Sequence, residues 1–107
     1  MDRYDELREK IRVFNEERDW DQFHSPVNLA KSVCIEAAEL LECFQWSDEY
    51  DLQAVSEEMA DVFTYLIDLA EKLGVDLLDS TDKKMDKNAQ KYPVEKARGN
   101  SLKYDRY

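Results

Sequence analysis

The sequence is poor in the residues that make turns, metal fingers and disulfides. Its 107 residues include two glycines, two prolines, two cysteines and one histidine. So little turn chemistry is unfavourable for a β-rich fold and favours an all-α protein. His24 alone cannot form a zinc site. A chain of this length is expected to form a single domain.

The two cysteines are not expected to be bridged. Cys34 and Cys43 lie nine residues apart in one predicted helix, which separates their Cα atoms by about 13 Å. That distance is too long for a disulfide, so we expect reduced thiols that pack as small apolar groups. The sequence also has no signal peptide and no long apolar run. We therefore expect a cytoplasmic protein.

Basic residues are outnumbered as well. The chain has 15 Lys and Arg against 25 Asp and Glu, which gives a net charge of −10. This charge disfavours binding to nucleic acid polymers and to acidic membranes. Nucleotides remain possible ligands, because a bound metal ion can invert the local field.

Apolar residues recur at helical spacing in four segments. We expect helices over about residues 2–18, 26–44, 52–73 and 76–90. Ser25 and Pro26 form a typical helix start, and Gly74 fits the position that follows a helix end. The segment from Tyr92 onward is expected to be extended. Four helices of this length predict a four-helix bundle-like fold.

The third predicted helix is apolar around much of its circumference. Its main stripe runs from Leu52 to Leu73, and Phe63, Tyr65 and Ile67 lie off that stripe. A small helical protein with such a helix is expected to bury it in an oligomer.

Four acidic residues stand out inside the apolar second and third helices. They form two pairs with i, i+3 spacing, Glu36 with Glu39 and Glu58 with Asp61. Residues three apart share one helix face, and a buried carboxylate costs several kcal/mol unless it is neutralised, paired or bound to metal. Two such pairs predict a site for one divalent cation such as Mg²⁺, which prefers oxygen ligands. The alternative is that they are acids at the edge of an ordinary amphipathic face. Glu57 is an alternative to Glu58 as the first acid of the second pair, because Glu57 and Asp61 are spaced at i, i+4.

These acids and the segments around them resemble a known family. Glu36-x-x-Glu39 followed by Glu58-x-x-Asp61 resembles the metal motif of the MazG-like all-α nucleoside triphosphate pyrophosphohydrolases. The segments ERDWDQFH, ELLECFQW, EEMADVFTY, KMDKN and KYP are similar to the single-domain branch that includes the dCTP pyrophosphatases. The resemblance covers residues 3–98, so we expect a MazG-like domain over residues 1–98 and a C-terminal tail over residues 99–107.

The resemblance implies an activity and an assembly. It implies cleavage of a nucleoside triphosphate, dCTP or a related dNTP, to monophosphate and pyrophosphate, with Mg²⁺ or Mn²⁺ as cofactor and nucleotide-pool sanitation as the role. It also implies a homotetramer built as a dimer of dimers. In a close branch of the family, a histidine in the first helix helps to recognise the base. The matching residue here is Ile11, which leaves the preference for cytosine open.

The resemblance also implies roles for individual residues. The implied metal ligands are Glu36, Glu39, Glu58 and Asp61. The implied walls of the base site are Trp20 and Trp46. The residues implied near the phosphates or sugar are Tyr65, Lys84, Asn88, Lys91 and Tyr92. One of the four carboxylates could instead orient or deprotonate the attacking water, and Glu39 is our candidate.

The two tryptophans are separated by the whole second helix, about 27 Å along its axis. We therefore predict that Trp20 and Trp46 meet across a subunit interface, one from each protomer. Two other classes of function stay open. One is a non-catalytic helical interaction or regulatory module, and the other is a hydrolase of another phosphoanhydride, such as a phosphoribosyl-ATP-like or (p)ppGpp-like substrate. The four acids favour a hydrolase over the module, and the tryptophan pair favours a nucleotide-base pocket.

Overall fold

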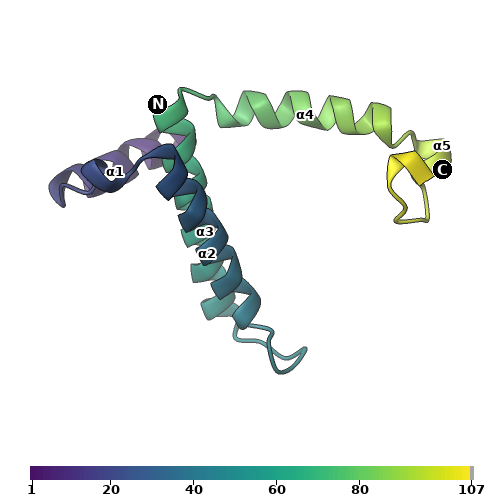
Figure 1. Cartoon of the computed structure of the whole chain (residues 1–107), viewed down its shortest axis with the longest axis horizontal. Helices are drawn as coiled ribbons and strands as arrows, with labels where there is room; N and C mark the ends of the chain where they lie inside the picture. The colour runs from purple at the N-terminus through teal and green to yellow at the C-terminus, as the bar shows by residue number, and fades with distance from the viewer. Residues whose placement is uncertain (107) are drawn as a thin grey trace. The chain divides into compact units, whose positions relative to one another are not determined.

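A computed structural model describes residues 1–106, and within that range the chain is all-α with no strand. The elements, labelled in Figure 1, are α1 (Arg3–Glu17), η1 (Asp21–Phe23), α2 (Pro26–Glu42), α3 (Leu52–Leu73), α4 (Leu77–Lys91), α5 (Val94–Ala97) and η2 (Tyr104–Arg106), where η marks a short 3₁₀ helix. The chain divides into a first compact unit, Met1–Val75, and a second that begins at Asp76. The all-α prediction is confirmed.

Local capping sets the helix boundaries. Ser25 caps α2 by accepting a hydrogen bond from the Asn28 amide at 3.1 Å, and Pro26 occupies the first turn, as predicted. Gly74 ends α3 in the left-handed region with φ 68°, which a residue without a Cβ adopts at little cost. Asp2 and Asp76, which we expected inside helices, are N-caps whose carboxylates accept backbone amide hydrogen bonds. Short polar side chains favour that position over a helix interior.

The segment after Tyr92 is not simply extended, which corrects the sequence-based expectation. Pro93 is the N-cap of the four-residue helix α5, a position where a missing N–H costs no helical hydrogen bond. Within the second unit the ring of Tyr104 packs edge-on against Tyr92 at 6.0 Å, and Lys91 Nζ lies 5.1 Å from the Tyr104 ring centre. The predicted boundary between a MazG-like domain, residues 1–98, and a C-terminal tail, residues 99–107, stays a prediction. Residue 107 of that tail lies outside the described part of the chain.

The first unit is a helical hairpin crossed by one helix. Helices α2 and α3 lie side by side, and α1 lies across the end of the hairpin opposite the α2–α3 loop (Figure 1). Leu29 of α2 and Ile67 of α3 are fully buried in this packing. Arg8 of α1 pairs with Glu71 of α3, which helps to fix α1 against the second half of α3.

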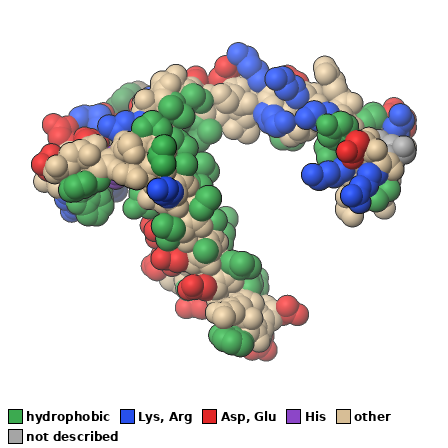
Figure 2. Space-filling model, in the orientation of Figure 1, with side chains coloured by type: hydrophobic (Ala, Val, Ile, Leu, Met, Phe, Trp, Pro, Cys, Tyr) green, Lys and Arg blue, Asp and Glu red, His purple; other side chains and the backbone are tan. Residues whose placement is uncertain are grey.

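Much of the hairpin's apolar surface is exposed. Figure 2 shows hydrophobic side chains along it, and the exposed large ones on its two helices include Ile35, Leu41, Leu52, Met59, Phe63 and Leu73. Leu52, Met59 and Leu73 belong to the main apolar stripe of the predicted helix and are exposed, whereas Ile67, predicted off that stripe, is fully buried. α3 packs mainly against α2 and, at fewer positions, against α1, so only part of its circumference is covered. No helix in the described residues is both long and apolar enough to span a bilayer.

The two cysteines are unbridged as expected, but Cys34 is exposed rather than packed as a small apolar group. Cys34 lies in α2 and Cys43 follows its last residue, and both are free thiols.

Candidate functional site

Acidic side chains from α2 and α3 converge in the middle of the hairpin. Glu36 comes from α2, and Glu58 and Asp61 come from α3. One carboxylate oxygen from each of the three lies within 4.8 Å of the others. The i, i+3 spacing places Glu58 and Asp61 on one face of α3, and the hairpin turns that face toward Glu36. The structure therefore brings together three of the four predicted metal ligands.

The three carboxylates are electrostatically unfavourable as they stand. Oε2 of Glu36 and Oε2 of Glu58 are buried and have no hydrogen-bond partner among the described residues. Burial and the neighbouring carboxylates of Glu39, Asp61 and Glu58 raise the pKa of Glu36 to about 7. Burial, together with Glu39 and Asp61, also raises the pKa of Glu58. A cluster of unpartnered carboxylate oxygens fits a hard divalent cation, which would relieve both the repulsion and the missing contacts.

The remaining acids differ in their surroundings. Glu39 is exposed and lies outside the group of three, yet it is close enough to raise the pKa of both Glu36 and Glu58. Glu57, the competing candidate on α3, is exposed and accepts a hydrogen bond from Gln53 at 3.1 Å. The group of three contains Glu58 and not Glu57, in agreement with the i, i+3 interpretation.

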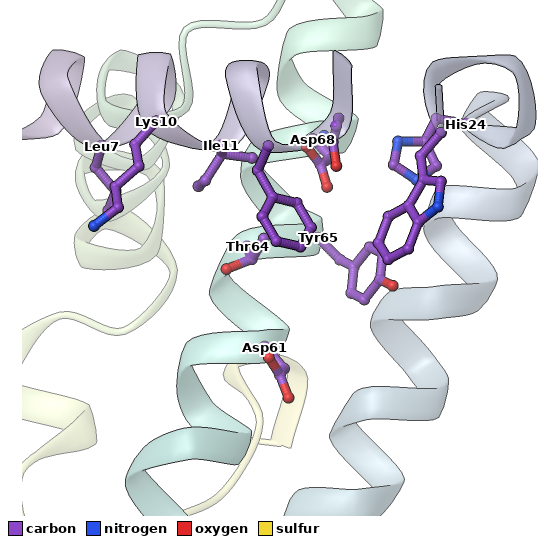
Figure 3. Close-up of a pocket in the computed structure, with 11 residues that line it drawn as sticks. Leu7, Lys10, Ile11, His24, Asp61, Thr64, Tyr65 and Asp68 are labelled. Atoms are coloured by element: carbon purple, nitrogen blue, oxygen red, sulfur yellow. Dashed lines mark hydrogen bonds between the residues drawn. The ribbon is translucent and has the colours of Figure 1, made fainter. Parts of the chain in front are cut away.

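A cavity of about 390 Å³ adjoins the acidic cluster and shares Asp61 with it. Figure 3 shows it between α1 and α3, with His24 at its edge. Its apolar walls include Ile11, Phe14, Trp20 and Tyr65. Its polar lining residues include Lys10, Asn15, His24, Thr64 and Asp68. Apolar walls with a few polar groups are typical of small-molecule sites.

Trp20 is held at the wall of this cavity by the turn after α1. Asp19 adopts φ 53°, in the left-handed region, and its carboxylate accepts a hydrogen bond from Gln22 Nε2 at 2.9 Å. This turn lets the Trp20 amide donate to the Asn15 carbonyl at 3.0 Å. The Trp20 ring then packs edge-on against Phe14 at 5.5 Å. Two aromatic rings from separate segments thus form one wall.

The polar lining of the cavity contains groups that sequence reasoning missed. Asn15 Nδ2 donates to Asp68 Oδ1 at 2.9 Å, and both side chains are buried. Burial raises the pKa of Asp68, and the hydrogen bond from Asn15 opposes that shift. His24 packs edge-on against Tyr65 at 6.5 Å. The available signal was the spacing of polar residues on apolar helix faces, with Asn15 four residues after Ile11 and Asp68 three residues after Tyr65.

Other predicted site residues lie elsewhere. Trp46, in the loop after α2, is 89% exposed and does not line the cavity of its own chain. Four further candidates belong to the second unit, and these are Lys84, Asn88, Lys91 and Tyr92. Lys84 and Asn88 are one turn apart on α4, and Figure 2 shows Lys and Arg side chains gathered over that helix. Their roles at a nucleotide stay predictions.

Comparison with known proteins identifies the family to which the chain belongs. The chain is 39% identical to dCTP pyrophosphatase 1 of Mus musculus and 38% identical to dCTP pyrophosphatase 1 of Homo sapiens, each over 110 aligned positions. These alignments cover 94% of this chain and 65% of the relatives, so the chain spans slightly less than two thirds of their length. The crystal structure of a pyrophosphatase from Archaeoglobus fulgidus matches with a TM-score of 0.79 at 38% identity, over 87% of this chain and 94% of that one. The family model described as MazG-like matches residues 31–106. The family resemblance is thereby confirmed, and the chain belongs to the MazG-like family.

Proposed function

We propose that this protein hydrolyses nucleoside triphosphates, dCTP or a related dNTP, to the monophosphate and pyrophosphate, in nucleotide-pool sanitation. The observation that carries the proposal is the pair of buried, unpartnered carboxylate oxygens of Glu36 and Glu58 beside an aromatic cavity that shares Asp61. A cation site next to a base-sized, apolar-walled cavity suits a metal-bound nucleotide. The names of the relatives, dCTP pyrophosphatase and pyrophosphatase, support the same activity.

Glu36, Glu58 and Asp61, joined by Glu39, would hold the divalent cation, Mg²⁺ or alternatively Mn²⁺. Their all-oxygen donor set is the kind that these hard cations prefer. When bound, the cation supplies charge neutralisation and polarisation of phosphoryl oxygens. This matters here, because the protein carries a net charge of −10 and the substrate is a polyanion.

The protein's own residues would orient the attacking water and the substrate. Water attacks the α-phosphorus, a new P–O bond forms, and the bond from the α-phosphorus to the bridging oxygen breaks, so that pyrophosphate leaves with the electron pair. Glu39 is exposed beside the buried acids and is our candidate to orient the water and accept its proton. Trp20 and Phe14 would stack on the base. Tyr65, Lys84, Asn88, Lys91 and Tyr92 are our candidates for contacts to the phosphates or sugar.

The working form is a homotetramer, a dimer of dimers. Large apolar side chains remain exposed along α2 and α3, for example Leu41 at 70%, and a second copy of the hairpin could bury them. Trp46, at 89% exposed, would then complete the base site of a partner subunit. Light scattering behind a sizing column measures the mass directly, and a monomer at micromolar concentration would contradict this assembly.

Pyrophosphate release from each canonical dNTP, with and without Mg²⁺, tests the activity. Asp61→Asn removes a charged ligand with little change of shape and is expected to lower turnover on the order of 10²-fold or more. Glu57→Gln is the matched control on the same helix and is expected to keep full activity. Full activity of Asp61→Asn at saturating Mg²⁺ would refute the ligand assignment. Release of another product, or activity only on other phosphoanhydrides, would favour the alternative hydrolase, and no activity with any substrate would favour the helical module.

Mixing of subunits tests the shared base site. Trp20→Ala and Trp46→Ala proteins, each weakly active alone at low dNTP concentration, are expected to recover activity there after subunit exchange, because a mixed assembly contains sites with both rings intact. Exchange is followed independently by mass-tagged subunits. If subunits exchange and no activity returns beyond the sum of the two variants, Trp46 does not serve the partner's site.

A further inference from the structure

The buried Asn15–Asp68 pair is a feature of the cavity to which the proposed reaction assigns no role. Asn15 is 6% exposed and Asp68 is 7% exposed, and both line the cavity that adjoins the acidic cluster. The Asn15 amide donates to Oδ1 of Asp68, and this is the one hydrogen bond of the Asp68 side chain among residues 1–106. A buried carboxylate normally needs more than one partner. Its second oxygen, Oδ2, makes no hydrogen bond with the described residues and is not among the side-chain oxygens shut off from solvent, so a ligand can reach it.

The position of Asp68 relative to the acidic cluster defines which part of a ligand it meets. Asp61, Tyr65 and Asp68 follow one another at i, i+4 and i+7 on one face of α3, and Figure 3 shows Asp61 and Asp68 on opposite sides of Tyr65 along the helix. Seven residues correspond to about 10 Å along the axis. That is comparable to the length of a nucleoside monophosphate. A nucleotide whose phosphates lie at Asp61 would place its base beside Asp68.

The chemistry of the Asn15–Asp68 pair determines which group of the base Asp68 can bind. Because Oδ2 of Asp68 is an acceptor, its matching ligand group is a donor. The apolar walls of the cavity, Ile11, Phe14 and Trp20, offer stacking surface. His24, at the edge of the same cavity, is close enough to Asp68 to oppose the rise of its pKa. Asn15 holds the carboxylate through Oδ1 and so fixes its orientation.

We propose that Asp68, oriented by Asn15, is the specificity-determining residue of the base pocket and accepts a hydrogen bond from the exocyclic amino group of the base. This inference rests on the proposed nucleotide hydrolysis. It commits the enzyme to amino-bearing bases, such as cytosine or adenine, over the corresponding bases that carry an oxo group at the same position. A site that hydrogen-bonds a polar ligand group rejects the analogue lacking it more strongly than an apolar wall does.

The test compares substrates that differ by one amino-to-oxo replacement, dCTP with dUTP and dATP with dITP. The wild-type kcat/KM is expected to favour the amino member of the preferred pair at least about tenfold, the scale of one hydrogen bond to a charged group. Asp68→Asn keeps an oxygen for Asn15 and turns an NH₂ toward the ligand. Its preference is expected to shift toward the oxo member by about tenfold or more. Glu71→Gln, one turn away on α3 and outside this cavity, removes a nearby charge and is expected to leave the ratio unchanged.

A second variant separates recognition from folding. The exchange of the pair, Asn15→Asp with Asp68→Asn, keeps the total charge and the hydrogen bond but moves the carboxylate onto α1. It is expected to lose the amino preference as the single variant does. Ratios within about twofold of wild type in folded variants, or a wild type that does not discriminate, would overturn the proposal. If neither variant folds, the pair is a structural contact between α1 and α3, and the proposal is likewise refuted.

Binding measurements distinguish this inference from the hydrolysis on which it rests. If no triphosphate is hydrolysed, the proposed function fails, and tryptophan fluorescence titrations with dCMP, dUMP, dAMP and dIMP still test Asp68. Stronger binding of the amino member of a pair, lost in Asp68→Asn, supports the recognition role without any turnover. Equal binding of both members in every pair contradicts it.

Discussion

Replacing Glu36 with glutamine is expected to stabilise the metal-free protein while it removes function. The carboxylate of Glu36 is desolvated and surrounded by Glu39, Asp61 and Glu58, which raises its pKa from the ordinary 4.5 to about 7. A carboxyl pKa that is higher in the folded than in the unfolded state means that the charged form opposes folding. The penalty is absent below pH 4.5 and fully present above pH 7. Glutamine keeps the shape and removes the charge.

The size of the effect follows from the pKa values. Each pKa unit corresponds to about 1.36 kcal/mol, so the change from 4.5 to about 7 sets an upper limit of about 3 kcal/mol. Glu36 is partly solvated, and solvent screening reduces this to about 1 kcal/mol. In a domain of this size about 1 kcal/mol raises the melting temperature by about 4–8 °C.

Thermal unfolding followed by circular dichroism, in EDTA at fixed protein concentration, measures this change. Wild type is expected to lose stability as the pH rises from 4.5 to 8, and Glu36→Gln is expected to flatten that slope and to melt higher at pH 8. Glu57→Gln, an exposed acid on α3, is expected to match wild type throughout. A melting temperature of Glu36→Gln equal to or below that of wild type at pH 8 would refute the view that the cluster is strained without a cation.

Three further outcomes are expected. Millimolar Mg²⁺ is expected to raise the melting temperature of wild type by mass action and to have little effect on that of Glu58→Gln, as measured by differential scanning fluorimetry. Equal increases in melting temperature for both proteins would show that Glu58 does not bind the cation. Trp20→Ala is expected to weaken dNTP binding by about 5- to 150-fold, the range for loss of one stacked base, measured as KM or by titration; unchanged affinity would place the base elsewhere. Asp19→Val is expected to cost about 1–2 kcal/mol of folding free energy in urea unfolding, because a β-branched residue is strained at φ 53°. Asp19→Gly is expected to be near neutral in the same assay. Equal loss of stability in both variants would assign the effect to the hydrogen bond with Gln22.

Local chemistry in the sequence was enough to predict the helices and most of the acidic cluster. Ser25 and Pro26 begin α2, and Gly74 ends α3, because capping and turn preferences act within a few residues. The i, i+3 spacing of Glu58 and Asp61 could be read from the chain for the same reason. Helix geometry alone places them on one face.

The tertiary structure decided which distant groups meet. Asn15 and Asp68 are 53 residues apart in the chain, and only the crossing of α1 over α3 joins them at the cavity. Trp20, a candidate from the sequence, lines the cavity, but its contact with Phe14 depends on the left-handed turn at Asp19. Such contacts depend on how helices pack, and periodicity within one helix carries no information about the face of another. The sequence by itself determined which residues could do chemistry, and the packing of the hairpin with α1 decided which of them share a site.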